Sequence, residues 1–270
     1  VDGYYNTAIG TSALRSNVDG PNNLAIGFQA LYANTSGSEN MAVGVYSLDA
    51  NTTGGLNTAI SSNTLSKNTT GRFNVAIGYS ALRDNLTTNN NVAIGYFALN
   101  SLNYTGDSYN VAVGYNAGLS VSTGIQNTLI GGIAGDALTT GTGNTAVGYA
   151  ALSVEQAGGR NVAIGWKALV NQNTGVDSYN VAVGYEAGYG FDTESHNTAI
   201  GYRAMRQQSG SNVVAIGAFS QYGAGSANAG NENTCIGSYS LQAITTGYEN
   251  TTIGLEAGNT FTTWTKKFVI

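Results

Sequence analysis

Residues 74–78 read Asn-Val-Ala-Ile-Gly, and variants of this five-residue box, Asn-(Val/Thr)-Ala-(Ile/Val)-Gly, recur along almost the whole chain. Most of them start 17 residues after the previous one. The starts are Asn6, Asn23, Asn40, Asn57, Asn74, Asn91, Asn110, Asn127, Asn144, Asn161, Asn180, Asn197, Asn233 and Asn250, with a degenerate copy at Val213. A short fixed period of this kind indicates a repeat architecture, in which each unit packs against its neighbours.

The length and composition of the repeat favour strands over helices. A helical hairpin needs roughly 33 residues, and Val, Ile and Thr are typical of strands. We therefore expect an all-β fold, a parallel β-solenoid of about fifteen 17-residue coils over residues 1–258. Each coil is expected to supply a strand, a short second strand and a turn. Residues 259–270 leave the box pattern, and we expect a cap, a linker or a tail that exchanges a strand with another subunit.

A second level of repetition predicts two longer loops. Residues 106–115 read Gly-Asp-Ser-Tyr-Asn-Val-Ala-Val-Gly-Tyr, and residues 175–185 repeat them with one inserted residue, Val176. A two-residue insertion lies near each copy, at residues 103–104 and 173–174. We interpret this as a segmental duplication with a longer loop at one corner of the coil, and not as a domain boundary.

The box places small or apolar residues on both faces of its strand. Because side chains alternate along a strand, Val75 and Ile77 share one face and Ala76 points to the other. A thin solenoid covers only one of these faces, and a long exposed apolar stripe is rare in monomers. We therefore expect an obligate oligomer that packs along the length of the solenoid.

Boxes such as residues 91–95 and 161–165, both Asn-Val-Ala-Ile-Gly, resemble the head repeats of trimeric autotransporter adhesins and related repeats of phage tail fibres. The resemblance covers roughly residues 4–258. It implies a left-handed β-roll, a side-by-side homotrimer, and a role in attachment at a virion or bacterial cell surface. The unit is longer than the commoner adhesin-head repeat, and no coiled-coil stalk or membrane anchor follows, so we expect a fibre segment rather than a complete adhesin.

Two box positions are expected to be structural. The fourteen box asparagines can form a ladder of hydrogen-bonded amides from coil to coil, with ligand binding as the alternative interpretation. The box glycine is expected to provide a positive φ or a close backbone approach, so Ser61, its sole replacement, predicts local strain. Asn-x-Ser/Thr triplets follow from the composition, and we assign them no function; they start at Asn34, Asn51, Asn68, Asn85, Asn103 and Asn250.

Aromatic residues that follow the box glycine predict a column on one side of the coils. Such a column can pack against a neighbouring protomer or stack on sugar rings. Together with the tyrosines near the longer loops, the candidate glycan contacts are Tyr96, Tyr104, Tyr109, Tyr115, Tyr149, Trp166, Tyr179, Tyr185, Tyr189 and Tyr202.

The composition argues against several other classes of protein. The chain carries a net charge of −5 with ten scattered Lys and Arg residues, and no long apolar run, so we expect neither nucleic-acid binding nor membrane insertion. His196 is the single histidine and lies at a turn position, and Cys235 is the single cysteine and occupies a box alanine position. With its carboxylates thinly scattered, the chain predicts no catalytic site, no metal site and no cofactor.

Three functions are compatible with these patterns. The first is a non-enzymatic fibre or adhesin segment outside the cell, which attaches to a cell-surface polysaccharide or receptor through many weak contacts. The second is a self-polymerising filament subunit joined head to tail by strand addition. The third, an ice-binding solenoid, would need a flat threonine array, whereas the threonine pairs such as Thr52-Thr53 lie in glycine-bounded turns.

Overall fold

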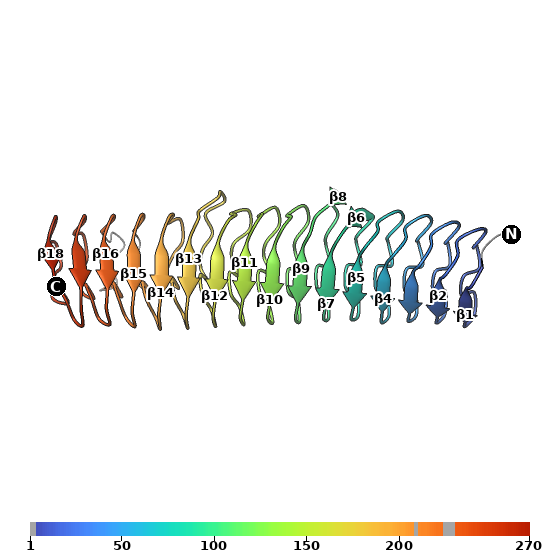
Figure 1. The fold of residues 1–270 in the computed structure, drawn as a ribbon, viewed down its shortest axis with the longest axis horizontal. Helices are drawn as coiled ribbons and strands as arrows, with labels where there is room; N and C mark the ends of the chain where they lie inside the picture. Colours follow the sequence, from blue (N-terminus) through green and yellow to red (C-terminus); the bar gives the residue numbers. More distant parts are fainter. Residues whose placement is uncertain (1–3, 208–209, 224–229) are drawn as a thin grey trace. The chain divides into compact units, whose positions relative to one another are not determined.

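The computed structural model describes residues 4–207, 210–223 and 230–270, which form two compact units, Val1–Thr140 and Gly141–Ile270. Each unit is an all-β parallel solenoid, and none of the described residues is helical. Figure 1 shows the strands of each unit as successive arrows that point in the same direction, one for each coil. This confirms the expected fold class.

The first unit contains eight box strands that follow each other in sequence order. Neighbouring strands are parallel and in box register, so that Val75 pairs with Val92 and Ala76 with Ala93. The strands are β1 (Thr7–Ile9), β2 (Leu24–Ile26), β3 (Met41–Val43), β4 (Thr58–Ile60), β5 (Val75–Ile77), β7 (Val92–Ile94), β9 (Val111–Val113) and β10 (Thr128–Ile130). A separate two-stranded sheet, β6 (Thr87–Asn89) with β8 (Thr105–Asp107), lies at the first of the two longer loops.

The second unit repeats this arrangement. Its strands are β11 (Thr145–Val147), β12 (Val162–Ile164), β13 (Val181–Val183), β14 (Thr198–Ile200), β15 (Val214–Ile216), β16 (Thr234–Ile236), β17 (Thr251–Ile253) and β18 (Phe268–Val269). The second longer loop, around residues 173–178, projects from the coil between β12 and β13 (Figure 1). Both insertions therefore lengthen a loop before a box, as expected.

The core of each coil is built from small and medium-sized apolar side chains. The box alanine points inward, and an Ala-Leu pair after the box glycine faces it, as Ala76, Ala81 and Leu82 illustrate; all three are fully buried. Alanine suits this place because the coil is narrow and the two walls lie close together.

The expected second strand does not form. After the box glycine, alternate residues adopt left-handed conformations, for example Ser80 with φ 55° and Leu82 with φ 50°. A strand needs negative φ throughout, so this segment is a run of turns instead. Its backbone groups still bond to the next coil, as from Leu82 N–H to Ala98 O at 3.0 Å. The expected short second strand is therefore wrong for this segment, although its Ala and Leu side chains are buried.

The box glycine is required by both its φ and its surroundings. Gly78 has a φ of 128°, and a Cβ atom added there would lie 2.4 Å from the carbonyl oxygen of Gly95 in the next coil. Ser61 occupies the same place with a φ of 115°, a value that side-chain-bearing residues rarely adopt.

The backbone of the last residues does not leave the repeat. Phe268 and Val269 form β18, which pairs in parallel with β17 through Thr251 and Thr252. The N–H of Lys267 donates to Oδ1 of Asn250 at 3.1 Å, as a box asparagine would. Residues 259–270 therefore continue the solenoid as one more coil, although their side chains depart from the box. Whether they serve as a cap, a linker or a strand-exchange tail stays a prediction.

Candidate functional site

The box asparagines line the interior of each unit as a ladder. The backbone N–H and the Nδ2 of Asn91 each donate to Oδ1 of Asn74 at 3.1 Å, and Nδ2 of Asn74 donates to the carbonyl oxygen of Thr88 at 2.8 Å. The box asparagines from Asn23 to Asn250 are all buried, and Asn6 is partly buried. Their amides are engaged inside the coil, which is a structural arrangement rather than a ligand site.

A second amide ladder escaped the sequence interpretation. Asn17, Asn34, Asn51, Asn68 and Asn85 lie at one position of successive coils, and each Nδ2 donates to Oδ1 of the previous asparagine, as from Asn51 to Asn34 at 2.7 Å. The 17-residue spacing was the signal that could have revealed it. Four of these residues head Asn-x-Ser/Thr triplets and are fully buried in the folded chain.

In later coils, the interior position of this second ladder is occupied by residues other than asparagine. In the first unit it passes to the apolar residues Leu102, Val121 and Leu138, and in the second unit it begins with Glu155 and Gln172. Glu155 is fully buried and accepts four hydrogen bonds, from the backbone N–H groups of Gln156, Gly158 and Thr174 and from the side-chain amide of Gln172. The Thr174 hydroxyl lies 3.1 Å from its Oε2 and donates to the carbonyl oxygen of Val176 at 2.6 Å. These bonds tie the second longer loop to the interior of the coil.

The aromatic residues after the box glycines form two separate stacks. In the first unit, Tyr96 lies between Tyr79 and Tyr115, with ring centroids 5.4 and 5.6 Å apart. In the second unit the stack runs through Tyr149, Trp166, Tyr185 and Tyr202, at centroid distances of 6.4, 4.8 and 5.3 Å. The rings are nearly parallel, so each inner ring has another ring on both sides.

This geometry changes what the aromatic columns offer to a ligand. All seven side chains are exposed. Because each inner ring has a ring on both sides, we expect its exposed part to be mainly its edge and its polar tip. Stacking of a sugar on a ring face, the contact that motivated the sequence hypothesis, is therefore blocked along the interior of each stack. The columns present instead the positive ring edges, the tyrosine hydroxyls and the indole N–H.

The four remaining candidate aromatics lie outside the stacks. Tyr104 contacts Thr88 through its backbone, and its carbonyl oxygen accepts from the Thr88 hydroxyl. In the first unit, Tyr109 donates to Asp107 at 3.1 Å, and this bond raises the pKa of the phenol. In the second unit, Tyr189 lies below the guanidinium of Arg206.

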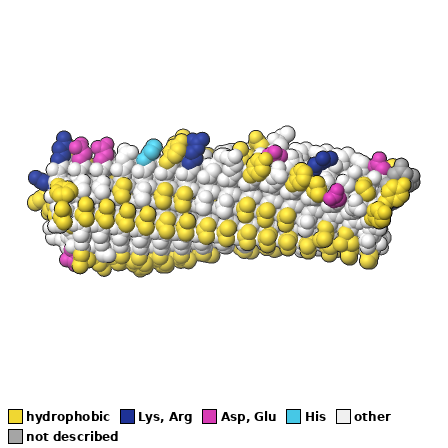
Figure 2. Space-filling model, in the orientation of Figure 1, with side chains coloured by type: hydrophobic (Ala, Val, Ile, Leu, Met, Phe, Trp, Pro, Cys, Tyr) yellow, Lys and Arg dark blue, Asp and Glu magenta, His cyan; other side chains and the backbone are white. Residues whose placement is uncertain are grey.

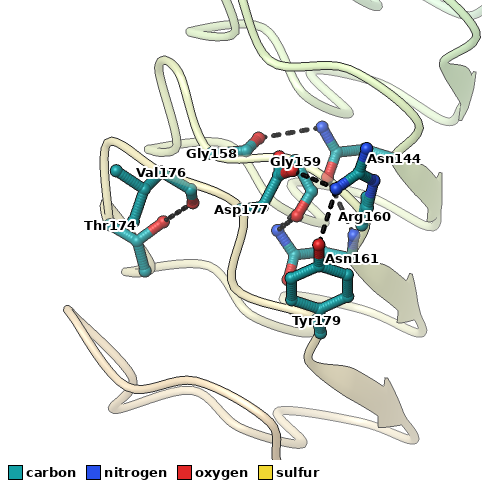
Figure 3. Close-up of polar contacts among 9 residues, drawn as sticks. All are labelled: Asn144, Gly158, Gly159, Arg160, Asn161, Thr174, Val176, Asp177 and Tyr179. Carbon is teal, nitrogen blue, oxygen red and sulfur yellow. Dashed lines mark hydrogen bonds and ion pairs between the residues drawn. The ribbon is translucent and has the colours of Figure 1, made fainter.

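Tyr179 belongs to a polar cluster at the second longer loop (Figure 3). Arg160 donates to Asp177 and to the hydroxyl of Tyr179, and the ring of Tyr179 stacks on His196 with centroids 5.2 Å apart. Below this cluster, Asn161 donates to Asn144 in the box ladder. The hydrogen bond that Arg160 donates to Tyr179 raises the pKa of the guanidinium above its ordinary value.

Charged groups that the sequence interpretation did not single out border the second stack. The Nζ of Lys167 lies 4.4 Å from the centroid of Trp166, and the guanidinium of Arg203 lies over the rings of Tyr185 and Tyr202. They could have been found from their spacing, since Lys167 and Arg203 are both the second residue after a box glycine.

A buried carboxylate anchors the arginines of this border. Glu186 is only 5% exposed and accepts from Nε of Arg203 at 2.9 Å and Nε of Arg206 at 2.5 Å. Burial alone would raise the pKa of Glu186, but the hydrogen bonds from the two arginines outweigh it and hold the pKa below its ordinary value.

No three His, Cys, Asp or Glu side chains among the described residues are placed to hold a metal ion. His196 is exposed, and Cys235 is buried at a box alanine position, where desolvation raises the pKa of its thiol to about 12. In the same described ranges, no helix is long and apolar enough to cross a membrane.

Compared with known proteins, the chain matches no family model, and no curated protein shows significant similarity to it.

Proposed function

We propose that this chain is a non-enzymatic structural segment of an extracellular attachment fibre or surface adhesin. Its coils associate side by side with other copies, in a homotrimer of left-handed rolls, and its exposed side chains attach the assembly to a cell-surface glycan or receptor. The register of the strands, which pairs residues 17 positions apart such as Val75 with Val92, supports the 17-residue coil of this proposal.

One observation carries the proposal. The fourth residue of each box is always Ile or Val, points away from the core and remains partly or largely exposed; Ile164, for example, is 38% exposed. The second residue lies on the same face and is Thr in seven of the fifteen boxes. Figure 2 shows hydrophobic side chains in rows along the face in view. A continuous apolar row of this kind is unfavourable in water, and covering it is the usual reason for obligate assembly.

The threonine pairs do not support the ice-binding alternative. The hydroxyl of Thr52 donates to the carbonyl oxygen of Thr69 at 3.0 Å, and that of Thr245 donates to Thr262 O at 2.8 Å. These hydroxyl protons join neighbouring coils, so they are not available to order a water layer.

The proposal is tested by the native mass of the full chain in dilute solution, measured by light scattering, with negative-stain images of the same sample. A discrete species of three times 27.7 kDa supports the trimer. Filaments of indefinite length would instead favour the self-polymerising subunit, and a stable monomer would contradict assembly through the strand face.

A further inference from the structure

We infer that the aromatic stack of the second unit, together with Lys167 and Arg203 beside it, binds an acidic polysaccharide, one whose sugars carry carboxylates. The inference rests on the proposed attachment function and adds the chemical class of the ligand. We call this surface the basic aromatic column; it comprises Tyr149, Trp166, Lys167, Tyr185, Arg203 and Tyr202.

The exposed parts of these rings suit an anion better than a neutral sugar face. Trp166 and Tyr185 each have a ring on both sides, at 6.4 and 4.8 Å for Trp166 and at 4.8 and 5.3 Å for Tyr185. Their edges, which carry the positive end of the ring quadrupole, face outward with the phenol and indole donors. Such a surface donates hydrogen bonds to carboxylates and sugar hydroxyls.

The charges beside the stack have the matching sign. Among the described residues, Lys167 has no acidic partner, while Arg203 and Arg206 share one carboxylate, that of Glu186. Three cations therefore face one buried anion in a chain whose overall charge is −5. A concentration of positive charge in an acidic protein is a local feature, and it favours a polyanionic partner.

The cations are spaced for a polymer that runs along the stack. Lys167 follows β12 and Arg203 follows β14, at the same position of the coil, and β13 lies between them in register. Adjacent parallel strands lie about 4.8 Å apart, so the two side chains start about 10 Å apart. Glu186 occupies the same position of the coil between them and is buried in its ion pairs with Arg203 and Arg206, so an extended polysaccharide on the column would meet one cation at every second coil.

The first unit provides a natural comparison within the same chain. The equivalent positions beside its stack are Ser80, Phe97 and Asn116, none of which is charged. The nearby Arg83 is held by Asp84 at 2.9 Å. Both stacks are therefore built from aromatic rings, but only the stack of the second unit has charged residues at these neighbouring positions. This difference assigns the preference for acidic sugars to the second unit.

The test measures binding of the native full chain to oligogalacturonate and to its methyl ester by isothermal titration calorimetry. The two probes share a sugar backbone, and the ester replaces each carboxylate by a neutral group with one added methyl. We expect the acid form to bind at least about tenfold more tightly at low salt and to lose this advantage at high salt, because exposed charges are screened. Equal affinity for both probes would overturn the inference about acidic sugars but leave the proposed glycan attachment intact. If neither probe binds, the inference about acidic sugars is overturned as well.

Variants localise the effect. We expect Lys167→Gln and Arg203→Gln each to weaken binding of the acid form about two- to fivefold, as loss of one exposed charge contact does, and Lys167→Arg to retain it. Arg72→Gln, which removes an exposed charge of the first unit, is the control and should bind like the native chain. An equal loss in Arg72→Gln would show a general charge effect and contradict the assignment to this column. The native mass of each variant shows whether assembly, and not the column, has failed.

Discussion

Asparagine at the start of the box matches the backbone geometry of a stacked coil. Its side-chain oxygen accepts from the next coil, and its amide nitrogen donates to a carbonyl oxygen in the coil wall, so one short side chain satisfies groups of two layers. A buried backbone group left unpaired costs about 1–3 kcal/mol, so each asparagine removes a substantial penalty. The same reasoning explains the second ladder, which recurs at one position in the first five coils.

Ser61 lies where the fold requires glycine. Ser61→Gly should therefore stabilise the chain by about 1 kcal/mol. This figure is the free energy gained by relieving the strained φ, less the cost of the extra conformational entropy that glycine gives the unfolded state. Gly78→Ser, the reverse change one coil later, should destabilise it, because the new Cβ would meet Gly95 O at 2.4 Å. Denaturation midpoints in urea measure both. A neutral or destabilising Ser61→Gly would show that the serine conformation is not strained.

Asp49 gives the fold a pH dependence. Burial raises the pKa of its carboxyl from the ordinary value of 3.8 to about 6, and among the described residues its buried Oδ1 has no hydrogen-bond partner. Below about pH 4 the Asp49 carboxyl is protonated in both the folded and the unfolded chain. As the pH rises through about 6, the free energy of unfolding falls, because the folded chain then carries a poorly solvated carboxylate. Asp49→Asn should therefore raise the urea midpoint at pH 8 and change it little near pH 4.

Asp84 serves as the control of opposite sign. Hydrogen bonds from Arg83 and then Lys67 hold the pKa of its carboxyl below the ordinary value. Its contribution to stability is present above pH 3.8 and is lost as the pH falls through the lower folded-state pKa. Asp84→Asn should thus lower the midpoint at pH 8. If both variants shift it in the same direction at pH 8, the interpretation of Asp49 by burial is wrong.

A coil combines a three-residue strand with a run of turns, and the longer loops are additions to this unit. In the second unit the loop is held by Glu155, which replaces an interior amide and accepts bonds from Gly158 and Thr174. A carboxylate suits this place because all its neighbours donate, and it has two oxygens to receive them.

Glu155→Gln should therefore loosen the second longer loop. The amide nitrogen would face N–H donors, and we expect a loss of about 2 kcal/mol in stability with faster hydrogen exchange in residues 172–178. Glu232→Gln, an exposed glutamate of the same unit, is the matched control and should have little effect. Unchanged exchange in Glu155→Gln would show that the loop is held by other contacts.

At the scale of the whole molecule, each unit leaves the outer side of its strands apolar and partly exposed. The fifteen boxes repeat the same outward-facing strand surface in every coil, so an interface that fits one coil also fits the next. This is why assembly, rather than a local pocket, dominates the proposed function.

Ile164→Lys should break the assembly without unfolding the chain, because the side chain is 38% exposed and lies on the strand face. Light scattering should show a species of 27.7 kDa in place of the oligomer. Val176→Lys, a change on the longer loop where the side chain is 67% exposed, should leave the mass of the oligomer unchanged. An oligomer that persists in Ile164→Lys would place the interface elsewhere.

The sequence by itself determined the parallel solenoid, the inward box alanine and the need for glycine at the box end, because period, alternation and φ preference are local properties that each coil repeats. Other features appear only in the folded chain. The turns with alternating positive φ and the continuing coil at Phe268 depend on contacts between coils, which no single unit encodes. The second amide ladder has its 17-residue spacing in the sequence, but its hydrogen bonds also form only between coils. The candidate site was predicted as a set of rings, but the stacking that covers their faces, and the approach of Lys167 and Arg203, follow from how successive coils lie on one another.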